Sequence, residues 1–203
     1  MFAIGHMALA YLLSKTSEKF FRIKASVPLI LVLSLLPDID IILMRDMHRG
    51  PTHSIITAVV IFIPVFIFYR QRGIPYFLSL VSHSLIADFM IGGQLQLLWP
   101  LTAQELGLNE LVSYYIGIYD SLNVMLELSL FAASTTFLFI SRDILKFFRN
   151  RTLNLVLVVP ILTVLLPAFF GYPLSVPVLL NLPHLFYLTL FSVAVLAAFL
   201  PKP

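Results

Sequence analysis

Long apolar runs, separated by short polar stretches, make up most of this 203-residue chain. Several runs approach the length of about 20 apolar residues with which a helix crosses a bilayer. The first run is shorter, which predicts a short or re-entrant helix. The pattern as a whole predicts an all-α, polytopic transmembrane bundle of six or seven segments, at residues 2–14, 27–44, 55–69, 74–91, 121–140, 153–170 and 176–200.

A proline interrupts the second segment at Pro37. Proline removes a backbone donor and its ring clashes with the preceding turn, so the helix should end or kink there. If the chain is extended after the break, Asp38 and Asp40 point to the same side of it. The break is therefore predicted to present two carboxylates together at one end of a membrane segment.

The composition agrees with a membrane protein, because 60% of the residues are hydrophobic, 11% are charged and the mean hydropathy is +0.98. We expect one membrane-embedded domain over residues 1–203, with the polar motifs in 1–119 and additional transmembrane helices in 120–203. A net charge of +3, held in short clusters, gives no indication of nucleic-acid binding. His6 interrupts the first apolar run, so no cleavable signal peptide is expected. The absence of cysteine excludes disulfides and thiolate ligands.

The basic residues alternate between successive connections. Of the 13 Lys and Arg residues, eleven follow the first, third, fifth and seventh segments, and the other two, Arg45 and Arg49, follow the second. The positive-inside rule makes the first set cytoplasmic, with the N-terminus outside and the C-terminus inside. This predicts a multi-pass protein of the cell (inner or plasma) membrane, with its Asp and His motifs gathered at the outer face.

Seven residues with metal-binding side chains fall at the predicted outer ends of the segments. A carboxylate in the middle of a membrane helix costs roughly 2.5 to 3.5 kcal/mol on insertion scales, so this concentration requires a compensating partner. Imidazoles and carboxylates together suit zinc, with manganese or iron as alternatives, and seven donors would suffice for one or two divalent ions. The predicted ligands are His6, Asp38, Asp40, His48, His53, His83 and Asp88.

Other polar residues are expected to have different roles. His184 is predicted to be a hydrogen-bonded packing residue. Glu127 lies about two turns inside its helix, where it could form an ion pair, bind a metal or carry protons. Trp99 could be an interfacial anchor or a wall of the site. Four other acidic residues are expected in solvated loops or at a helix start: Asp46, Glu105, Glu110 and Asp120.

Several motifs occur in a characteristic order: Gly5-His6, LPDID at 36–40, HRGPTHS at 48–54, Ser82-His83 followed by Asp88, and Leu98-Trp99-Pro100. This order resembles that of the YdjM-like, LexA-regulated inner-membrane metal-dependent hydrolases. The resemblance covers about the first half of the chain, and it implies a membrane metallohydrolase. It extends more distantly to the zinc-dependent phospholipase C and P1 nuclease group.

The spacing of His83 and Asp88 departs from the family pattern, which has His-x-x-x-Asp. Here the two residues are five apart, and on a regular α-helix that spacing separates their side chains by about 140°. A π-bulge inserts one residue into a helix and would restore a common face. We therefore expect a π-helical turn if Asp88 binds the same ion as His83.

The chemistry that fits these residues is hydrolysis by metal-activated water, since a divalent ion lowers the pKa of bound water toward 7 and polarises an ester. Asp40 is the expected proton acceptor. Thr52 or Ser54 is expected to cap the third segment, and the start of that helix offers N–H groups to a phosphate. Arg49 could bind the same phosphate with two hydrogen bonds. A charge that snorkels toward the headgroups is the alternative role for Arg49.

The predicted substrate is therefore a membrane lipid or lipid-linked phosphoester at the outer face, bound by Arg49, Thr52, Ser54 and Trp99. Two other classes remain open. A transporter or proton-coupled carrier would also place His and Asp inside a bundle, although the chain contains no convincing internal repeat. A non-catalytic, metal-stabilised membrane scaffold would have a closed site, with no open coordination position.

Overall fold

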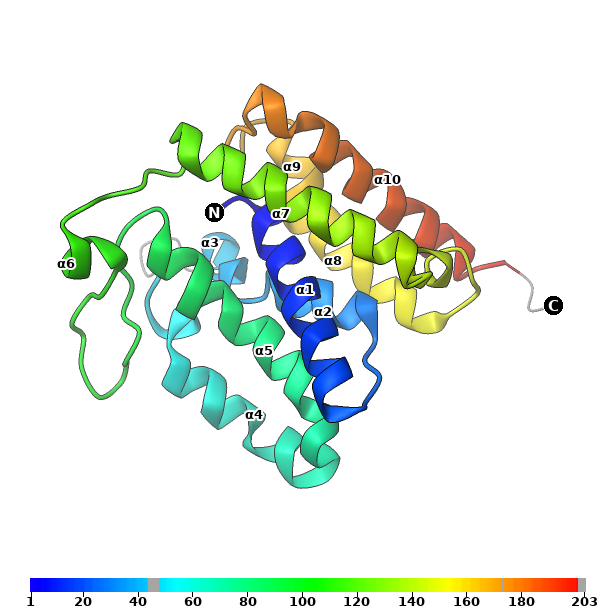
Figure 1. Cartoon of the computed structure of the whole chain (residues 1–203), viewed down its shortest axis with the longest axis horizontal. Helices are drawn as coiled ribbons and strands as arrows, with labels where there is room; N and C mark the ends of the chain where they lie inside the picture. The colour runs from blue at the N-terminus through cyan, green and yellow to red at the C-terminus, as the bar shows by residue number, and fades with distance from the viewer. Residues whose placement is uncertain (44–47, 173, 201–203) are drawn as a thin grey trace.

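The computed structural model describes residues 1–43, 48–172 and 174–200. Within these ranges the regular structure is helical, apart from one isolated antiparallel bridge between Leu95 and Leu106. The helix α1 (Ala3–Phe21) runs through the middle of the bundle, between α5 (Ile74–Ser82) and α7 (Ser121–Ile140) (Figure 1). The prediction of an all-α bundle is confirmed.

The central helix α1 is longer than the sequence predicted. It has 19 residues, which corresponds to about 28 Å of helix. It continues past Lys15, whose ammonium group pairs with Glu18 one turn further on and lies 3.1 Å from Asp143 Oδ2. Because these partners satisfy the charge, the helix does not end at the first lysine. The prediction that this segment ends at residue 14 was therefore wrong, and its re-entrant course stays a prediction.

The helix α2 (Val27–Leu33) returns beside α1 and ends before Pro37, as predicted. The chain after the break is not extended: Pro37–Ile39 form a 3₁₀ turn (η1), and α3 (Asp40–Leu43) follows at once. Residues two apart in a 3₁₀ turn lie on different sides. The prediction that Asp38 and Asp40 share one side was therefore wrong. The predicted loop residues Arg45 and Asp46 lie outside the described residues.

A second helical pair, α4 (Ile55–Tyr69) and α5, is joined by the 3₁₀ turn η4 (Arg70–Gly73). Ser54 caps α4, since its Oγ accepts hydrogen bonds from the N–H groups of Ile56 and Thr57. The rings of Phe62, Phe66 and Phe77 contact one another between α4 and α5. The predicted third segment matches α4 at both ends. The fourth continues from α5 into a π-helix (η5, His83–Asp88).

The C-terminal part supplies further helical stretches, beginning with α7 and the 3₁₀ turn η6 (Asp143–Lys146). α7 begins after Asp120, which accepts a hydrogen bond from Leu122 N at 2.9 Å and so confirms the predicted cap. Residues 152–168 form one irregular helical run, because Pro160 and Pro167 interrupt the backbone hydrogen bonding. Its parts are η7 (Thr152–Leu157), α8 (Val158–Pro160), the π-helix η8 (Ile161–Leu165) and α9 (Leu166–Ala168); η9 (Val178–Leu180) and α10 (Asn181–Ala197) follow.

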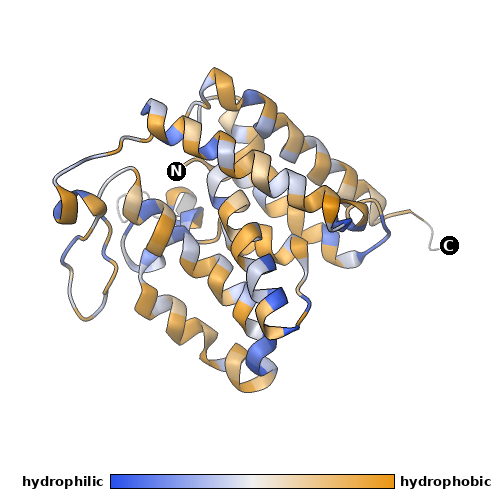
Figure 2. Cartoon of the chain, in the orientation of Figure 1, coloured by the Kyte–Doolittle hydropathy of each residue, from blue (hydrophilic) through white to orange (hydrophobic). Residues whose placement is uncertain are grey.

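Hydrophobic residues predominate along the helices, and many hydrophilic residues lie near the helix ends (Figure 2). Ile61 on α4, Phe139 on α7 and Leu182 on α10 are 57%, 56% and 76% exposed. Three described helical stretches, Ile55–Asp88, Ser121–Ile140 and Val178–Ala197, are long and apolar enough to cross a membrane, and Thr152–Ala168 is a shorter apolar helix. Exposed apolar faces of this extent are what lipid contact requires. The chain is a helical membrane protein.

Three of the basic connections meet at one end of the bundle. Besides its ion pair with Lys15, Asp143 accepts a hydrogen bond from Tyr11 Oη at 3.0 Å and lies 2.5 Å from Lys146 Nζ. Burial alone would raise the pKa of Asp143, but the hydrogen bonds from Lys146 and Lys15 lower it. Ser14 Oγ donates to Pro75 O at 2.9 Å, which brings the turn after α4 to the same end.

Glu127, whose role the sequence left open, holds the start of α1. Its carboxylate is fully buried and accepts hydrogen bonds from Phe2 N at 2.6 Å and Gly5 N at 3.1 Å. The first N–H groups of a helix have no partner within the helix, and a carboxylate there also interacts favourably with the helix dipole. Glu127 therefore ties α7 to the turn of α1 that carries His6.

We expect Gly5→Ala to weaken this junction. A Cβ atom at Gly5 would lie 2.9 Å from Glu127 Cγ, so the carboxylate would have to move away from its donors. Leaving such buried groups unpaired costs about 1 to 3 kcal/mol of unfolding free energy. For a chain of this size, each kcal/mol lowers Tm by roughly 2 to 4 °C. Thermal unfolding in detergent measures the change. Gly117→Ala is the control, because its Cβ would meet only Tyr115 at 3.6 Å, and an equal loss there would contradict the expectation.

Candidate metal centre

The imidazole of His53 occupies the middle of the polar cluster and is fully buried. Gly50 and Pro51 place it there, because Pro51 starts a 3₁₀ turn (η3, Pro51–His53) that His53 N closes on Gly50 O at 3.1 Å. The two ring nitrogens face different neighbours. Nε2 lies 3.5 Å from Asp38 Oδ1, and Nδ1 lies 3.4 Å from Asp40 Oδ2.

His83 is oriented by the helix end that Pro37 creates. Its Nδ1 lies 2.6 Å from the carbonyl oxygen of Ser34, the residue after the last turn of α2. A carbonyl only accepts hydrogen bonds, so Nδ1 carries a proton, and when the ring is neutral its lone pair lies on Nε2. A second hydrogen bond of this kind is the usual way in which a metal-binding histidine is oriented. Sequence analysis did not identify the Ser34 carbonyl.

Asp88 joins His83 through the predicted irregularity of the helix. Residues His83–Asp88 form a π-helix, and Asp88 Oδ2 lies 3.4 Å from His83 Nε2. The extra residue per turn offsets the separation that a regular helix would impose on this spacing. The prediction of a π-helical turn is confirmed, and the role of Asp88 as a ligand stays a prediction.

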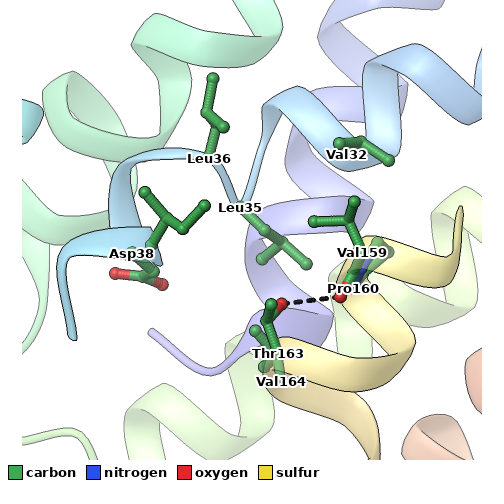
Figure 3. A pocket seen from close by; sticks show the side chains of 9 residues that line it. Val32, Leu35, Leu36, Asp38, Val159, Pro160, Thr163 and Val164 are labelled. Atoms are coloured by element: carbon green, nitrogen blue, oxygen red, sulfur yellow. Dashed lines mark hydrogen bonds between the residues drawn. The ribbon is translucent and has the colours of Figure 1, made fainter. Parts of the chain in front are cut away.

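Asp38 reaches the cluster from the turn after α2. Leu35, in the same turn, is buried, and in Figure 3 its side chain lies between Asp38 and the side chains of Val159 and Thr163. The cavity beside them has a volume of only about 10 Å³, roughly the space of one water molecule. Packing of this apolar turn against α8 and η8 therefore fixes the direction of the Asp38 carboxylate.

Four of the predicted ligands form one compact group of donor atoms: Asp38, His53, His83 and Asp88. His83 Nε2 lies 3.2 Å from His53 Nε2 and 3.3 Å from Asp38 Oδ1, and His53 Nε2 lies 3.3 Å from Asp88 Oδ2. Around a tetrahedral ion with bonds of about 2.0 to 2.1 Å, donor atoms are separated by roughly 3.3 to 3.4 Å. The donor set and its spacing thus fit one small divalent ion.

Asp40 and His48 form a second group with the other side of His53. Asp40 accepts hydrogen bonds from His48 Nδ1 at 2.9 Å and Thr52 Oγ1 at 2.5 Å, and the Thr52 oxygen lies 3.0 Å from His53 Nδ1. This arrangement orients the His53 ring by the same principle that orients His83. Because His53 Nδ1 already has these partners, the geometry favours Asp40 as a residue that orients His53. It is less suited to Asp40 as a ligand of a second ion.

The carboxylates make the cluster strongly attractive to cations. Burial alone would lower the pKa of His53, but hydrogen bonds to Asp38, Asp40 and Asp88 raise this pKa to about 11. The pKa of Asp38 falls below its usual value, because the attraction of His83 and the hydrogen bond from His53 outweigh the effect of burial. The field that holds a proton on His53 would equally favour a metal cation.

His6 lies against the four-donor group without joining it. Its ring stacks on His83, with the ring centres 3.8 Å apart, and its Nε2 lies 3.5 Å from Asp88 Oδ1. Its Nδ1 is buried and has no hydrogen-bond partner among the described residues. The structure thus brings all seven predicted ligands into one region, with four of them in the first group and His6 beside it.

A cavity of about 260 Å³ opens beside the four-donor group. Asp38, His48, Arg49 and Asp88 line its polar side. Arg49 Nη2 lies 3.5 Å from Asp88 Oδ1 and 3.4 Å from Ile91 O. The guanidinium fits closely over Gly92, where a Cβ atom would lie 2.7 Å from Nη2. The predicted position of Arg49 beside the ligands is therefore observed.

The start of α4 does not offer the predicted phosphate site. Ile55 N donates to Leu97 O at 3.0 Å, and the N–H groups of Ile56 and Thr57 are taken by Ser54 Oγ. Thr52 donates to Asp40 instead. Neither Thr52, Ser54 nor Trp99 lines the 260 Å³ cavity. The polar atoms of Thr52 and Ser54 thus serve local structure, and substrate binding by Thr52, Ser54 and Trp99 stays a prediction.

Much of the apolar wall of the cavity comes from helices and loops to which the sequence analysis gave no role in the site. Ile41 and Ile118 contribute from the first two thirds of the chain, and the C-terminal helices and loop supply Val164, Ala168, Leu174, Val176 and His184. His184 Nε2 lies 2.6 Å from Leu165 O, and its ring contacts the edge of Phe169. Apolar residues in apolar helices carry no sequence signal for such a role.

The fold and the site together define a helical membrane protein with a buried histidine and aspartate centre that could bind a metal ion. The chain belongs to the YdjM inner membrane protein family, whose model matches residues 1–174. This confirms the family resemblance and extends it from the first half of the chain to residue 174, which includes most of the cavity wall. Comparison with curated proteins and with solved structures gave no match.

Proposed function

We propose that the protein is a membrane-bound, metal-dependent hydrolase of a lipid or lipid-linked phosphoester. The observation that carries this proposal is the cavity of about 260 Å³, which is lined by two carboxylates of the four-donor group and Arg49 together with apolar side chains. Its volume is just below the roughly 300 Å³ at which small-molecule sites begin. It suits a phosphorylated headgroup and the first part of a hydrocarbon chain.

Asp38, His53, His83 and Asp88 would hold the ion, and zinc fits the mixed nitrogen and oxygen donors best, with manganese or iron as alternatives. When bound, a divalent ion supplies Lewis-acid activation of water and of a phosphoryl oxygen. Arg49 lies on the cavity wall, where its planar group is suited to binding and orienting a phosphate.

His48 is in the best position to accept a proton. It lines the cavity, its side chain is 31% exposed, and Asp40 holds its Nδ1 at 2.9 Å. A carboxylate at one nitrogen leaves the other nitrogen of the ring available to substrate or water. Asp40, predicted as the proton acceptor, is 1% exposed and does not line the cavity, so we assign it a positioning role through His48 and His53.

A metal-stabilised scaffold is the second candidate, because four protein donors can fill a tetrahedral site completely. The two candidates differ in what the ion does. In a scaffold, removing the ion lowers stability and no turnover exists to be lost. In a hydrolase, removing it also stops turnover, and adding it back restores the rate.

Hydrolysis of a short-chain lipid phosphoester in detergent tests the proposal. We expect release of phosphate or of a phosphorylated headgroup, inhibited by a chelator and restored by zinc. The same headgroup without a hydrocarbon chain should react more slowly, because it cannot contact the apolar side chains that line the cavity. Stoichiometric metal without chelator-sensitive turnover on any lipid phosphoester would favour the scaffold.

We also propose the orientation that the charge pattern predicts, with the basic end cytoplasmic and the metal centre at the outer face. Cysteine labelling of intact cells checks it, since the chain has no native cysteine. A cysteine at Glu110 should react with an impermeant thiol reagent, and one at Arg149 should react only after permeabilisation. Both positions are exposed, so the opposite labelling pattern would mean that the orientation is reversed.

A further inference from the structure

The connection between η5 and α7, residues 92–119, exposes large apolar side chains at the same end of the bundle as the metal centre. Leu101 is 81% exposed, Leu111 72%, Tyr115 58% and Tyr114 54%. This connection extends away from the bundle together with its short helix α6 (Leu108–Val112) (Figure 1). Several large apolar side chains exposed on one connection are typical of an interaction surface.

We propose that residues 92–119 form a lipid-binding platform that lies in the headgroup layer of the bilayer. The platform comprises the exposed side chains Trp99, Leu101, Leu111, Val112, Tyr114 and Tyr115. Tryptophan and tyrosine favour this layer, because their rings are apolar at one end and polar at the other. The partner of this surface is therefore the lipid itself.

Attachment of the platform to lipid-facing helices sets its depth. The carbonyl of Leu97 accepts from Ile55 N at 3.0 Å, and that of Trp99 accepts from Ser54 Oγ at 2.5 Å, so both bind the first turn of α4. Val59, the first strongly exposed apolar residue of α4, is 43% exposed and lies only about 6 Å further along the helix axis than Ile55. The platform thus continues the lipid-facing surface of α4.

The other end of the connection is attached to α1 and α7. Tyr119 packs its ring against Phe2 and precedes Asp120, the cap of α7. Leu122 and Met125, in the first turns of α7, are 51% and 59% exposed. Both ends of the platform therefore join the ends of helices whose apolar faces begin within one or two turns.

The charges of the platform indicate which lipid contacts it makes. Residues 92–119 contain no Lys or Arg, and their only charged residues are Glu105 and Glu110. Basic residues are what draws a surface to anionic lipids. The platform should therefore bind through aromatic and apolar contact, and it should not require anionic headgroups. Tyr115 also lines the cavity, so the platform borders the site directly.

Fluorescence of Trp99 tests this proposal, because it is the only tryptophan of the chain. In phosphatidylcholine vesicles we expect lipids brominated near the headgroup to quench Trp99 and aqueous iodide to have little effect. Adding anionic lipid should not change this. A double variant, Trp99→Phe with Ile61→Trp, serves as the control for depth, since Ile61 on α4 should respond to bromine deeper in the chains.

Single cysteines carrying an environment-sensitive dye give a second measurement. Leu101→Cys should show a blue shift on transfer from detergent to vesicles, and Gln104→Cys, exposed on the same connection, should not. Strong iodide quenching of Trp99 without bromine quenching would place the platform in water and overturn the proposal. Protection from both quenchers would also overturn it, because a second protein surface would then cover these residues.

Discussion

Replacing His53 by alanine is expected to abolish tight metal binding. His53 Nε2 lies 3.2 to 3.5 Å from donor atoms of the other three members of the group. In the variant, Asp38, His83 and Asp88 would remain, but alanine at position 53 could not supply the fourth ligand. We expect the affinity to fall by more than about 100-fold, because even outer-shell partners of metal ligands cost roughly 10- to 100-fold. Metal analysis of the purified protein and a zinc titration followed by thermal unfolding measure it.

His184→Ala is the matched control for this experiment. Both histidines are buried, at 0% and 2% exposure. His184, however, bonds to Leu165 O and contacts Phe169, and it belongs to neither donor group. We expect this variant to lose stability and to keep its metal. Equal loss of metal in both variants would mean that general destabilisation, and not coordination, explains the His53 result.

The parts of the site that were predictable from sequence are those encoded by local backbone chemistry. Proline at position 37 cannot continue a helix, and α2 ends before it. Five residues from His83 to Asp88 do not match a regular helical turn, and the structure contains a π-helix over those residues. Each inference depended on hydrogen bonding within a few residues, where the sequence determines the geometry.

The direction of the two neighbouring aspartates was not predictable in this way. Both an extended chain and a 3₁₀ turn satisfy the restriction that Pro37 imposes. The choice between them depends on the packing of Leu35 against α8 and η8, which follow more than 120 residues later. As a result Asp38 and Asp40 face opposite nitrogens of His53, and only Asp38 belongs to the four-donor group.

Contacts between distant segments also account for the other differences. Glu127 serves as a cap for α1 from a helix more than 100 residues away. Lys15 remains inside α1 because Asp143 lies beside it. The apolar wall of the cavity consists of residues such as Val164 and Ala168, which resemble any other residue of a membrane helix. A pattern along the chain does not contain these pairings.

The second large effect concerns Arg49, for which we expect Arg49→Lys to keep the metal and the fold and to lose most of the hydrolytic rate. Lysine retains the positive charge, but it lacks the planar group with two parallel donors that matches a phosphate. The shorter reach of a single ammonium group would also leave the contact with Ile91 O unmade. Turnover of a short-chain lipid phosphoester, compared at equal metal content, measures the effect.

Gly92→Ala tests the same role without changing the arginine. Its Cβ would lie 2.7 Å from Arg49 Nη2, at a backbone φ of +86° that also disfavours a side chain. Gly171→Ala controls for that backbone strain, since Gly171 has φ of +76° and its Cβ would meet Ser175 instead. If Arg49 orients the phosphate, Arg49→Lys and Gly92→Ala should both lower the rate at saturating metal, and Gly171→Ala should not. Full activity in Arg49→Lys would contradict this role, because the two parallel donors of the guanidinium would then be unnecessary for the reaction. Arg49 would then serve only as a charge at the membrane interface.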